Sequence, residues 1–292
     1  MTVDKETIQQ ISEAKETLST PGAKAYSVIS LKSVTKIAQD GGIPTKEIEV
    51  AALEQGIVPQ RYLRNIGTIG FKGQIKLLRS VVAVVGTGGL GGGIIELLAR
   101  QGVGSIIIID GERFTETDLN RQLMATEKDL GKYKVVAAAR RVREINSAVT
   151  VTSYKKRITR ENARRLIKEA QVVVDAMDNL PSRFITEEAC RDLGIPFVHG
   201  TIAGFSGQLI TIFPEDRGLA AIYGAPDALP ERGIELATGN PSATPTMVAA
   251  WQVQEVVKIV TGVGKPVRNR LLMLDASQGT AREIELGAGV PR

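Results

Sequence analysis

Residues 80–110 contain the strongest structural signal in the chain, a glycine-rich turn between two apolar runs. They read SVVAVVGTGGLGGGIIELLARQGVGSIIIID. The apolar run at residues 81–85 stops at a glycine cluster, which leads into an amphipathic segment and then a second apolar run at residues 106–109. The change from a strand period to a helix period and back predicts one βαβ unit, and therefore parallel strands in an α/β fold.

The glycines of this segment have the G-x-G-x-x-G spacing of nucleotide-binding turns, with Gly86, Gly88 and Gly91 at the three positions. In such turns the first glycine permits a tight turn, the second lets backbone approach a phosphate, and the third lets the helix pack close to the strand. The helix that begins near Gly91 would point unpaired N–H groups at that phosphate. Asp110 ends the second strand, where a carboxylate can accept hydrogen bonds from ribose hydroxyls. The segment therefore predicts a nucleotide site and leaves NAD, FAD and ATP open.

Composition is that of an ordinary globular protein. The chain has 292 residues, of which 43% are hydrophobic and 24% charged, and its net charge is +5. This length suits one large α/β domain or a domain with an appendage. The start lacks a basic-then-apolar signal pattern, and the uncharged stretch at residues 196–214 is interrupted by polar residues. We therefore expect a cytoplasmic protein without a membrane partner.

The chain divides into a small helical N-terminal extension at residues 1–60 and a main domain at residues 61–292. In the extension, helices are predicted at residues 5–18, 31–39 and 45–54. In the main domain, strands are predicted at residues 81–85, 105–110, 149–154, 172–176, 197–201, 207–213 and 270–275, and helices at residues 92–101, 134–146, 162–170, 180–193 and 246–261. The early βαβ order predicts parallel strands, and the short links between later strands predict antiparallel additions. The stretch at residues 218–246, rich in Gly, Ala and Pro, is expected to be a lid, a binding segment or a crossover.

Two helices of the extension are separated by a glycine turn at residues 40–44, which resembles a helix-turn-helix and raises DNA binding as an alternative. The second helix carries Glu47, Glu49 and Glu54 with a single lysine, which makes a poor surface for phosphates. A docking or oligomerisation role is therefore favoured over a nucleic-acid partner.

Several charged residues suit a phosphate site. Lys134 lies in the first turn of a predicted helix, where the helix dipole disfavours a cation, so phosphate neutralisation would explain its position; a solvated surface lysine is the alternative. The predicted strand at residues 172–176 carries Asp175 near its end, and Asp178 follows it, at the crevice where ligands of α/β sheets bind. One of these carboxylates can hold Mg²⁺ that bridges phosphate oxygens, and a helix cap is the alternative for one of them.

Together these spacings resemble the ThiF/MoeB/HesA family, the bacterial relatives of ubiquitin-activating enzymes, from about residue 60 to the C-terminus. The family motifs are R-Y-x-R-[QN], the glycine turn, a ribose acid, N-L-x-R-Q, G-x-x-K and D-x-x-D-N. In chain order they match residues 61–65, 86–91, 110, 118–122, 131–134 and 175–179.

The resemblance implies a Rossmann-like fold with a mixed sheet that binds ATP and Mg²⁺. Arg121 and Lys134 would contact the ATP phosphates, and Asp178 would take Mg²⁺. Arg64 would reach the ATP of the other subunit in a homodimer. The remaining nucleotide contacts would come from Gly86, Gly88, Gly89, Gly91, Asp110, Asp118, Asn120 and Asn179.

The reaction implied by the resemblance is attack of a carboxylate on the α-phosphate of ATP, which releases pyrophosphate and leaves an acyl-adenylate. The usual carboxylate is the Gly-Gly terminus of a ubiquitin-like sulfur-carrier protein. Alternatives are adenylation of a peptide or small-molecule carboxylate by the same fold and a non-enzymatic nucleotide-binding regulator. An NAD-dependent dehydrogenase is disfavoured because it would leave Arg121, Lys134 and Asp178 without a purpose.

Two departures from the family pattern matter. The family usually has Asn where this chain has Asp118, which puts an acid near anionic phosphates. Many members carry two C-x-x-C pairs that bind zinc, whereas Cys190 is the single cysteine here, so no four-cysteine zinc site is possible. Cys190 lies in a helical pattern and is expected to be a packing residue rather than a nucleophile. His199, the single histidine, lies in an apolar strand and is expected to be structural.

Overall fold

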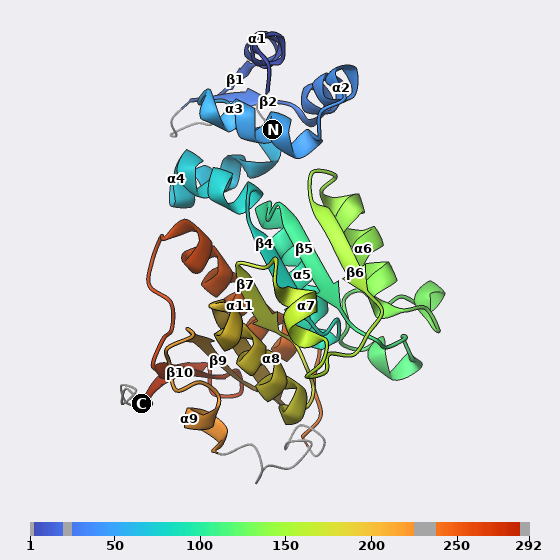
Figure 1. The fold of residues 1–292 in the computed structure, drawn as a ribbon, viewed down its shortest axis with the longest axis vertical. Helices are drawn as coiled ribbons and strands as arrows, with labels where there is room; N and C mark the ends of the chain where they lie inside the picture. Colours follow the sequence, from blue (N-terminus) through green and yellow to red (C-terminus); the bar gives the residue numbers. More distant parts are fainter. Residues whose placement is uncertain (1–2, 20–24, 225–237, 287–292) are drawn as a thin grey trace.

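The computed structural model describes residues 3–19, 25–224 and 238–286. Its largest element is an eight-stranded mixed sheet with helices on both faces (Figure 1). A smaller unit of helices and three short strands lies beyond one end of this sheet, and helix α4 (Leu63–Leu78) lies between the two. The architecture confirms the α/β, Rossmann-like fold with a mixed sheet.

Parallel strands form one side of the sheet and antiparallel strands the other. The strand order is β11-β10-β9-β8-β7-β4-β5-β6. Strands β8, β7, β4, β5 and β6 run parallel, and β9, β10 and β11 alternate in direction. The bounds are β4 (Val81–Val85), β5 (Ser105–Ile109), β6 (Thr150–Tyr154), β7 (Val172–Asp175), β8 (Phe197–Ala203), β9 (Ser206–Ile212), β10 (Arg270–Asp275) and β11 (Thr280–Glu285).

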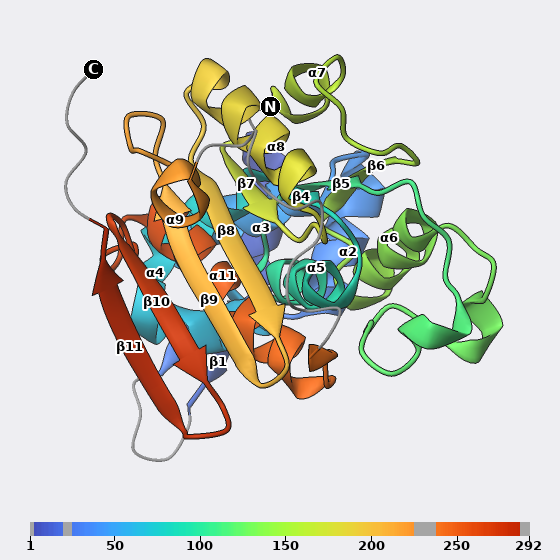
Figure 2. The ribbon, with the colours of Figure 1, turned by 90° about the horizontal axis from the view of Figure 1, so that it is seen from below.

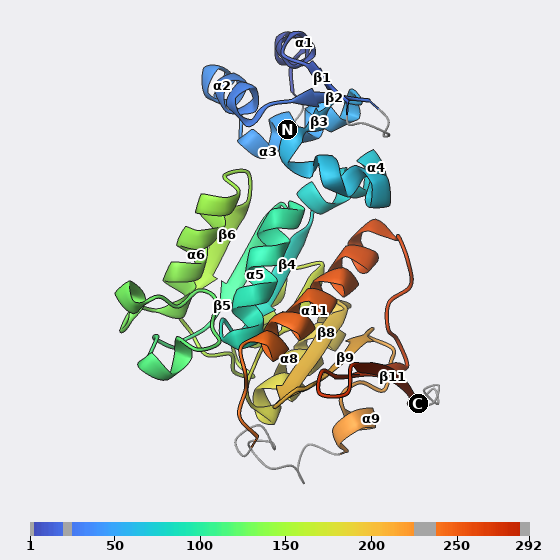
Figure 3. The same cartoon turned by 180° about the vertical axis from the view of Figure 1, so that it is seen from behind.

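Both faces of the sheet are buried by helices, as parallel strands require. In β4, Val82 and Val84 join one core cluster, whereas Ala83 and Val85 join the other, because successive strand side chains point to opposite faces. Figure 3 shows α5, α6 and α11 over the first face, and Figures 1 and 2 show α7 and α8 over the second. The helix bounds are α5 (Gly89–Gln101), α6 (Lys134–Ile145), α7 (Ala163–Ile167), α8 (Leu180–Leu193), α9 (Ala220–Tyr223) and α11 (Ala243–Thr261).

The N-terminal unit contains a small sheet that the sequence patterns did not reveal. Its elements are α1 (Lys5–Glu13), β1 (Glu16–Leu18), β2 (Tyr26–Ile29), α2 (Leu31–Gly41), α3 (Thr45–Glu54) and β3 (Val58–Pro59). The expected helix at residues 5–18 was wrong beyond Glu13, because residues 16–18 pair with β2 as an antiparallel strand. Such pairing overrides the weak local preference of a polar segment for a helix. In α3, residues 48–53 are buried consecutively, so this helix packs among its neighbours instead of presenting a recognition face.

All seven strands expected in the main domain are confirmed, and β11 is an addition. Helix α5 begins at Gly89, three residues before its expected start. The expected loop at residues 218–246 includes α9 and the beginning of α11, and its residues 225–237 lie outside the described residues. Among the described residues, no helix is both long and apolar enough to cross a membrane.

A buried polar cluster joins the N-terminal unit to the main domain. The Tyr62 hydroxyl donates to Glu49 Oε2 at 3.1 Å and accepts from Asn146 Nδ2 at 2.8 Å. Arg61 Nε lies 3.3 Å from Glu49 Oε1. Burial raises the pKa of Glu49 to about 7, although the Arg61 charge opposes the shift. Because Asn146 is the C-cap of α6, this cluster links α3 to the C-terminal end of that helix.

The raised pKa of Glu49 predicts a pH-dependent stability. The folded state binds a proton at Glu49 more tightly than the unfolded chain does, so its contribution is present below about pH 4.5 and is lost as the pH rises through about 7. We expect the free energy of unfolding to fall over this range by on the order of 2 kcal/mol more in the wild type than in Glu49→Gln. Urea unfolding at several pH values measures the difference, and identical pH slopes in both proteins would contradict it.

Candidate active site

The candidate site lies at the carboxyl edge of β4, β5 and β7. From β4 the chain continues to β5 and β6 on one side and returns to β7 on the other. The carboxyl ends of the strands beside such a switch in direction form the crevice where ligands of open α/β sheets bind. Three loops therefore meet there: the glycine turn after β4, the long loop after β5, and the acidic turn after β7.

The glycine turn depends on close backbone contacts. Gly86 has a φ of 98°, which disfavours other residues, and a Cβ there would lie 2.3 Å from the carbonyl oxygen of Ala176. A Cβ on Gly91 would lie 2.0 Å from the carbonyl oxygen of Gly86. Gly88 is the N-cap of α5 and has no side chain to satisfy the first N–H groups of the helix. The turn therefore presents free backbone donors at a helix N-terminus, which favours an anion.

Asp110 connects the glycine turn to the loop after β5. Its Oδ2 accepts the N–H of Thr87 at 2.8 Å, and its Oδ1 accepts the N–H of Glu112 at 2.7 Å. The side chain is partly exposed, so each oxygen keeps acceptor capacity for a ligand hydroxyl. This geometry suits the ribose role that the sequence spacing predicts.

The next part of the loop brings Arg121 and Asp118 against the same turn. The Cγ of Arg121 lies 3.6 Å from where a Cβ on Gly89 would be. Arg121 donates to the backbone oxygen of Thr117 at 2.6 Å and to Asn120 Oδ1 at 3.0 Å. Asp118 is buried, and its carboxylate lies 3.7 Å from the Arg121 guanidinium. The departure from the family's Asn thus places an anion beside a predicted phosphate-binding arginine.

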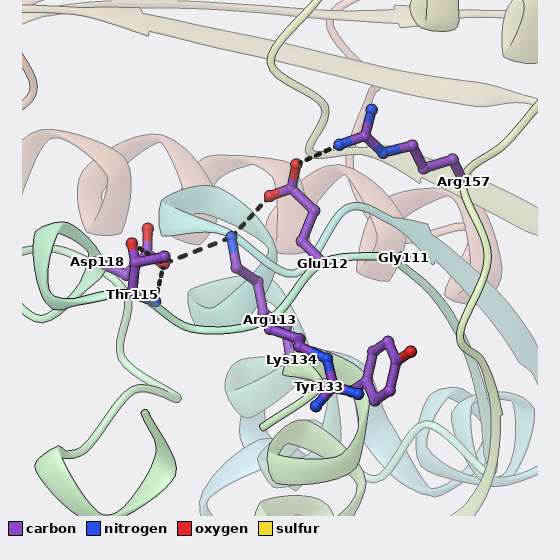
Figure 4. A pocket seen from close by; sticks show the side chains of 8 residues that line it. All are labelled: Gly111, Glu112, Arg113, Thr115, Asp118, Tyr133, Lys134 and Arg157. Atoms are coloured by element: carbon purple, nitrogen blue, oxygen red, sulfur yellow. Dashed lines mark hydrogen bonds and ion pairs between the residues drawn. The ribbon is translucent and has the colours of Figure 1, made fainter. Parts of the chain in front are cut away.

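Lys134 is buried in the first turn of α6 and is paired with acids, so it is not a solvated surface lysine. Its Nζ lies 2.9 Å from Glu112 Oε2 and 3.8 Å from Asp118 Oδ2. Arg157, which follows β6, reaches the other Glu112 oxygen at 3.2 Å. These side chains line an open cavity of about 450 Å³. Its lining residues are Gly111, Glu112, Arg113, Thr115, Asp118, Tyr133, Lys134 and Arg157. Figure 4 shows how they lie relative to one another.

The two acids after β7 have different surroundings. Asp175 is fully buried, where its carboxylate accepts the N–H of Met177 and lies 2.6 Å from His199 Nδ1 and 3.3 Å from Arg183 Nε. Asp178 is exposed, and its carboxylate accepts only the Asn179 amide, at 3.1 Å, among the described residues. The cap of α8 is Asn179, whose Oδ1 accepts the N–H of Ser182 at 2.9 Å, so Asp178 is left without a capping role.

Asp178 is therefore the carboxylate that is free for a metal. Among the described residues, no cluster of three His, Cys, Asp or Glu side chains could hold an ion by itself. Mg²⁺ commonly takes one or two carboxylates and completes its shell with phosphates and water. A single exposed carboxylate near the glycine turn fits that pattern.

His199 and Cys190 lie in the interior beneath this turn. Both His199 ring nitrogens are hydrogen-bonded, to Asp175 and to the Tyr223 hydroxyl at 3.0 Å, and burial lowers the pKa of the ring. Burial also raises the pKa of the Cys190 thiol, with the nearby acids adding to the effect. A buried thiol of raised pKa is a poor nucleophile, which agrees with the expected packing role.

Arg64 is the one expected catalytic residue that the structure does not bring to this edge. It lies in the first turn of α4, beyond the amino ends of the strands (Figure 1). Its side chain is exposed and has no ion pair among the residues described. Conversely, Glu112 and Arg157 were missed as members of the site. The order Asp110-Gly111-Glu112 directly after a strand was the available signal for Glu112, whereas nothing local marked Arg157.

The close contact at Gly91 predicts a sharp loss of stability on substitution. Gly91→Ala places a methyl group 2.0 Å from a backbone oxygen, so we expect the free energy of unfolding to fall by about 2–3 kcal/mol. The matched control is Gly67→Ala in α4, because a Cβ there meets nothing within 4 Å. That substitution should change stability by less than about 1 kcal/mol, in the stabilising direction. Equal effects of the two substitutions in chemical denaturation would show that the contact does not constrain the turn.

Comparison with known proteins agrees with this geometry. The ThiF family matches residues 62–289. The SAMP-activating enzyme E1 of Haloferax volcanii is 36% identical over 77% of this chain and 84% of its own length. The sulfur carrier protein adenylyltransferase of Thermus thermophilus is 33% identical over 77% of this chain and 86% of its own length. Several other relatives are longer, and the chain spans about half of their length.

Solved structures extend the likeness to the N-terminal unit. The crystal structure of MccB from E. coli with succinimide covers 97% of this chain and 87% of its own, with a TM-score of 0.69. At 18% identity this likeness describes the fold alone. The family match covers most of the chain and includes every motif of the carboxyl edge, so the chain belongs to the ThiF family.

Proposed function

We propose that this chain adenylates the C-terminal Gly-Gly carboxylate of a ubiquitin-like sulfur-carrier protein, using ATP and releasing pyrophosphate, in the cytoplasm where ATP is available. The observation that carries the proposal is that Arg121 and Lys134 lie with the free helix N-terminus of α5 and the ribose acid Asp110 at one edge of the sheet. As a ThiF-family member with adenylyltransferases as relatives, the chain is an adenylyltransferase. The names of those relatives support a sulfur-carrier substrate.

The reaction needs positioning and charge stabilisation rather than a covalent protein intermediate. A carboxylate oxygen forms a bond to the α-phosphorus while the bond from that phosphorus to the bridging oxygen of the β-phosphate breaks, and pyrophosphate leaves. Lys134 and Arg121 hold the phosphates and stabilise the charge that develops on their oxygens. Asp110 would fix the ribose. Asp178 would hold Mg²⁺, which when bound would supply Lewis-acid neutralisation of charge on the pyrophosphate.

The chain is expected to stop at the adenylate. Its single cysteine is buried in α8, so no exposed thiol is available to attack the adenylate and form a thioester. The sulfur that converts the carrier to a thiocarboxylate would therefore come from another protein.

A peptide or small-molecule carboxylate is the second candidate substrate. The observation that favours it is the N-terminal unit, which lies within the region that MccB covers but precedes the residues matched by the ThiF family. A non-enzymatic regulator is the third candidate function. A protein of this kind would bind nucleotide without turnover.

ATP–pyrophosphate exchange separates these functions. We expect exchange that depends on a sulfur carrier ending in Gly-Gly and disappears when the carrier lacks its last glycine. Because Asp178 would hold the metal, Asp178→Ala should lower exchange by about 100-fold while the melting temperature stays unchanged. Exchange without any carrier, or with peptides alone, would favour the second candidate, and binding of ATP without exchange would favour a regulator.

The active site is further proposed to be shared between two subunits. Arg64 lies beyond the amino end of β4, whereas the glycine turn follows its carboxyl end, and a strand of five residues separates them by about 16 Å. An arginine side chain does not span that distance and the adjoining loops. Supply of Arg64 to the site of a partner copy in a homodimer resolves the geometry.

Mixing of two inactive variants tests this arrangement. Arg64→Ala and Lys134→Ala should each lack activity, and a mixture allowed to exchange subunits should form heterodimers with one intact site. At equal amounts, recovery of about a quarter of the wild-type exchange rate is expected, since half of the dimers are mixed. Verified heterodimers that stay inactive would place Arg64 outside the partner's site.

A further inference from the structure

Five side chains at the rim of the site form a continuous row of alternating charge, which we call the charge row. Its order is Arg121, Asp118, Lys134, Glu112 and Arg157. Successive charged groups are separated by 3.7, 3.8, 2.9 and 3.2 Å. Figure 4 shows the central part of the row, in which Glu112 lies between Lys134 and Arg157.

The two acids of the row differ in how firmly they are held. Asp118 has a side chain only 8% exposed, and it accepts hydrogen bonds from the backbone and hydroxyl of Thr115 and from the Gln122 amide. Glu112 is 43% exposed and has only the two cations as side-chain partners among the described residues. Asp118 is therefore a fixed anion, and Glu112 is the anion that can move.

In the absence of nucleotide, the buried ammonium group of Lys134 needs an anion beside it. Its side chain is 5% exposed, and a buried ammonium without a partner is strongly disfavoured. Glu112 supplies that partner at 2.9 Å, in the direction of the open cavity. Asp118 already lies 3.8 Å from the same ammonium. A phosphate that binds Lys134 would therefore take the position of Glu112, because a third anion beside this cation would be repelled by the two carboxylates.

Arg157 offers the place to which Glu112 can move. Its side chain is 79% exposed and already contacts the Glu112 oxygen that faces away from Lys134. Glu112 now divides its two carboxylate oxygens between Lys134 and Arg157. A rotation of its side chain would pair both oxygens with Arg157 alone. The charges also set what can bind: the row holds three cations, Arg121, Lys134 and Arg157, and two acids, Asp118 and Glu112. The acids offset two of the three positive charges and so weaken the attraction of the row for a highly charged, metal-free triphosphate.

We propose that Glu112 is a displaceable counter-ion that occupies the phosphate position on Lys134, moves to Arg157 when nucleotide enters, and with Asp118 makes the site select the Mg²⁺ complex of ATP over the free nucleotide. The inference rests on the proposed function. It assigns Glu112 and Asp118 as specificity-determining residues and Arg157 as a positioning residue that acts through Glu112.

Calorimetric titration with a non-hydrolysable ATP analogue, in Mg²⁺ and separately in EDTA, tests the selection. Glu112→Gln keeps the side-chain shape and removes the charge, so binding of the metal-free analogue should tighten about tenfold, with a smaller change for the Mg²⁺ complex. Asp118→Asn should act in the same direction. Glu116→Gln is the matched control, because Glu116 is exposed in the same loop and has no ion pair among the described residues, so its two affinities should stay unchanged.

A double-mutant cycle tests the role of Arg157. Arg157→Gln should weaken binding of the Mg²⁺ complex by leaving Glu112 on Lys134, and it should have no further effect in the Glu112→Gln protein. Lys156→Gln controls for the loss of a nearby exposed positive charge. An equal effect of Arg157→Gln in both backgrounds would overturn the exchange of partners.

The remaining outcomes are distinct. If the wild type does not bind the analogue in Mg²⁺ or in EDTA, the proposed function is wrong, and the inference that rests on it falls with it. If the wild type binds the Mg²⁺ complex and Glu112→Gln weakens it in a protein of unchanged melting temperature, Glu112 positions Lys134 and is not displaced. If the ratio of the two affinities is the same in Glu112→Gln, Asp118→Asn and wild type, the acids do not select the metal complex.

Discussion

The backbone contact among Gly86, Gly91 and Ala176 sets the position of everything else at the carboxyl edge of the sheet. Side chains at either glycine would overlap a carbonyl oxygen, so the turn after β4 closes only with hydrogen atoms there. Its closure aims the N-terminus of α5 across the ends of the strands and brings the turn after β7 into contact with the turn after β4. Asp110 then ties the loop after β5 to the same point through two backbone N–H groups.

The positive charges at this edge are neutralised by acidic residues of the same chain. Lys134 and Arg121 would be costly to bury alone, and the loop that carries Asp110 also supplies the acids that neutralise them. Asp118 illustrates the point, because its departure from the family's asparagine would be unfavourable for phosphates in isolation. In the structure it lies between two cations and is held by Thr115 and Gln122, so it organises the loop while it reduces the charge.

Sequence patterns predicted the βαβ core well because strong periodicity and glycine spacing are local properties. The same patterns placed Asp175 and Asp178 at the carboxyl end of a parallel strand and Lys134 in the first turn of a helix. The sequence patterns failed where a segment's structure depends on residues that are distant in the sequence. Residues 16–18 carry no strand period and become a strand only by pairing with β2, and Arg157 joins the site only because β6 lies beside β5. The choice of Asn179 over Asp178 as helix cap also depends on local backbone geometry that residue types do not decide.

Helix α6 has its two ends in different parts of the molecule. It begins at Lys134, at the carboxyl edge of the sheet, and is capped by Asn146, which is hydrogen-bonded to Tyr62 in the junction with the N-terminal unit. A helix of twelve residues is a stiff rod about 18 Å long. The N-terminal unit therefore helps to fix the position of Lys134. A substitution at Glu49, whose carboxylate accepts the Tyr62 hydroxyl, would therefore reach the helix that carries Lys134.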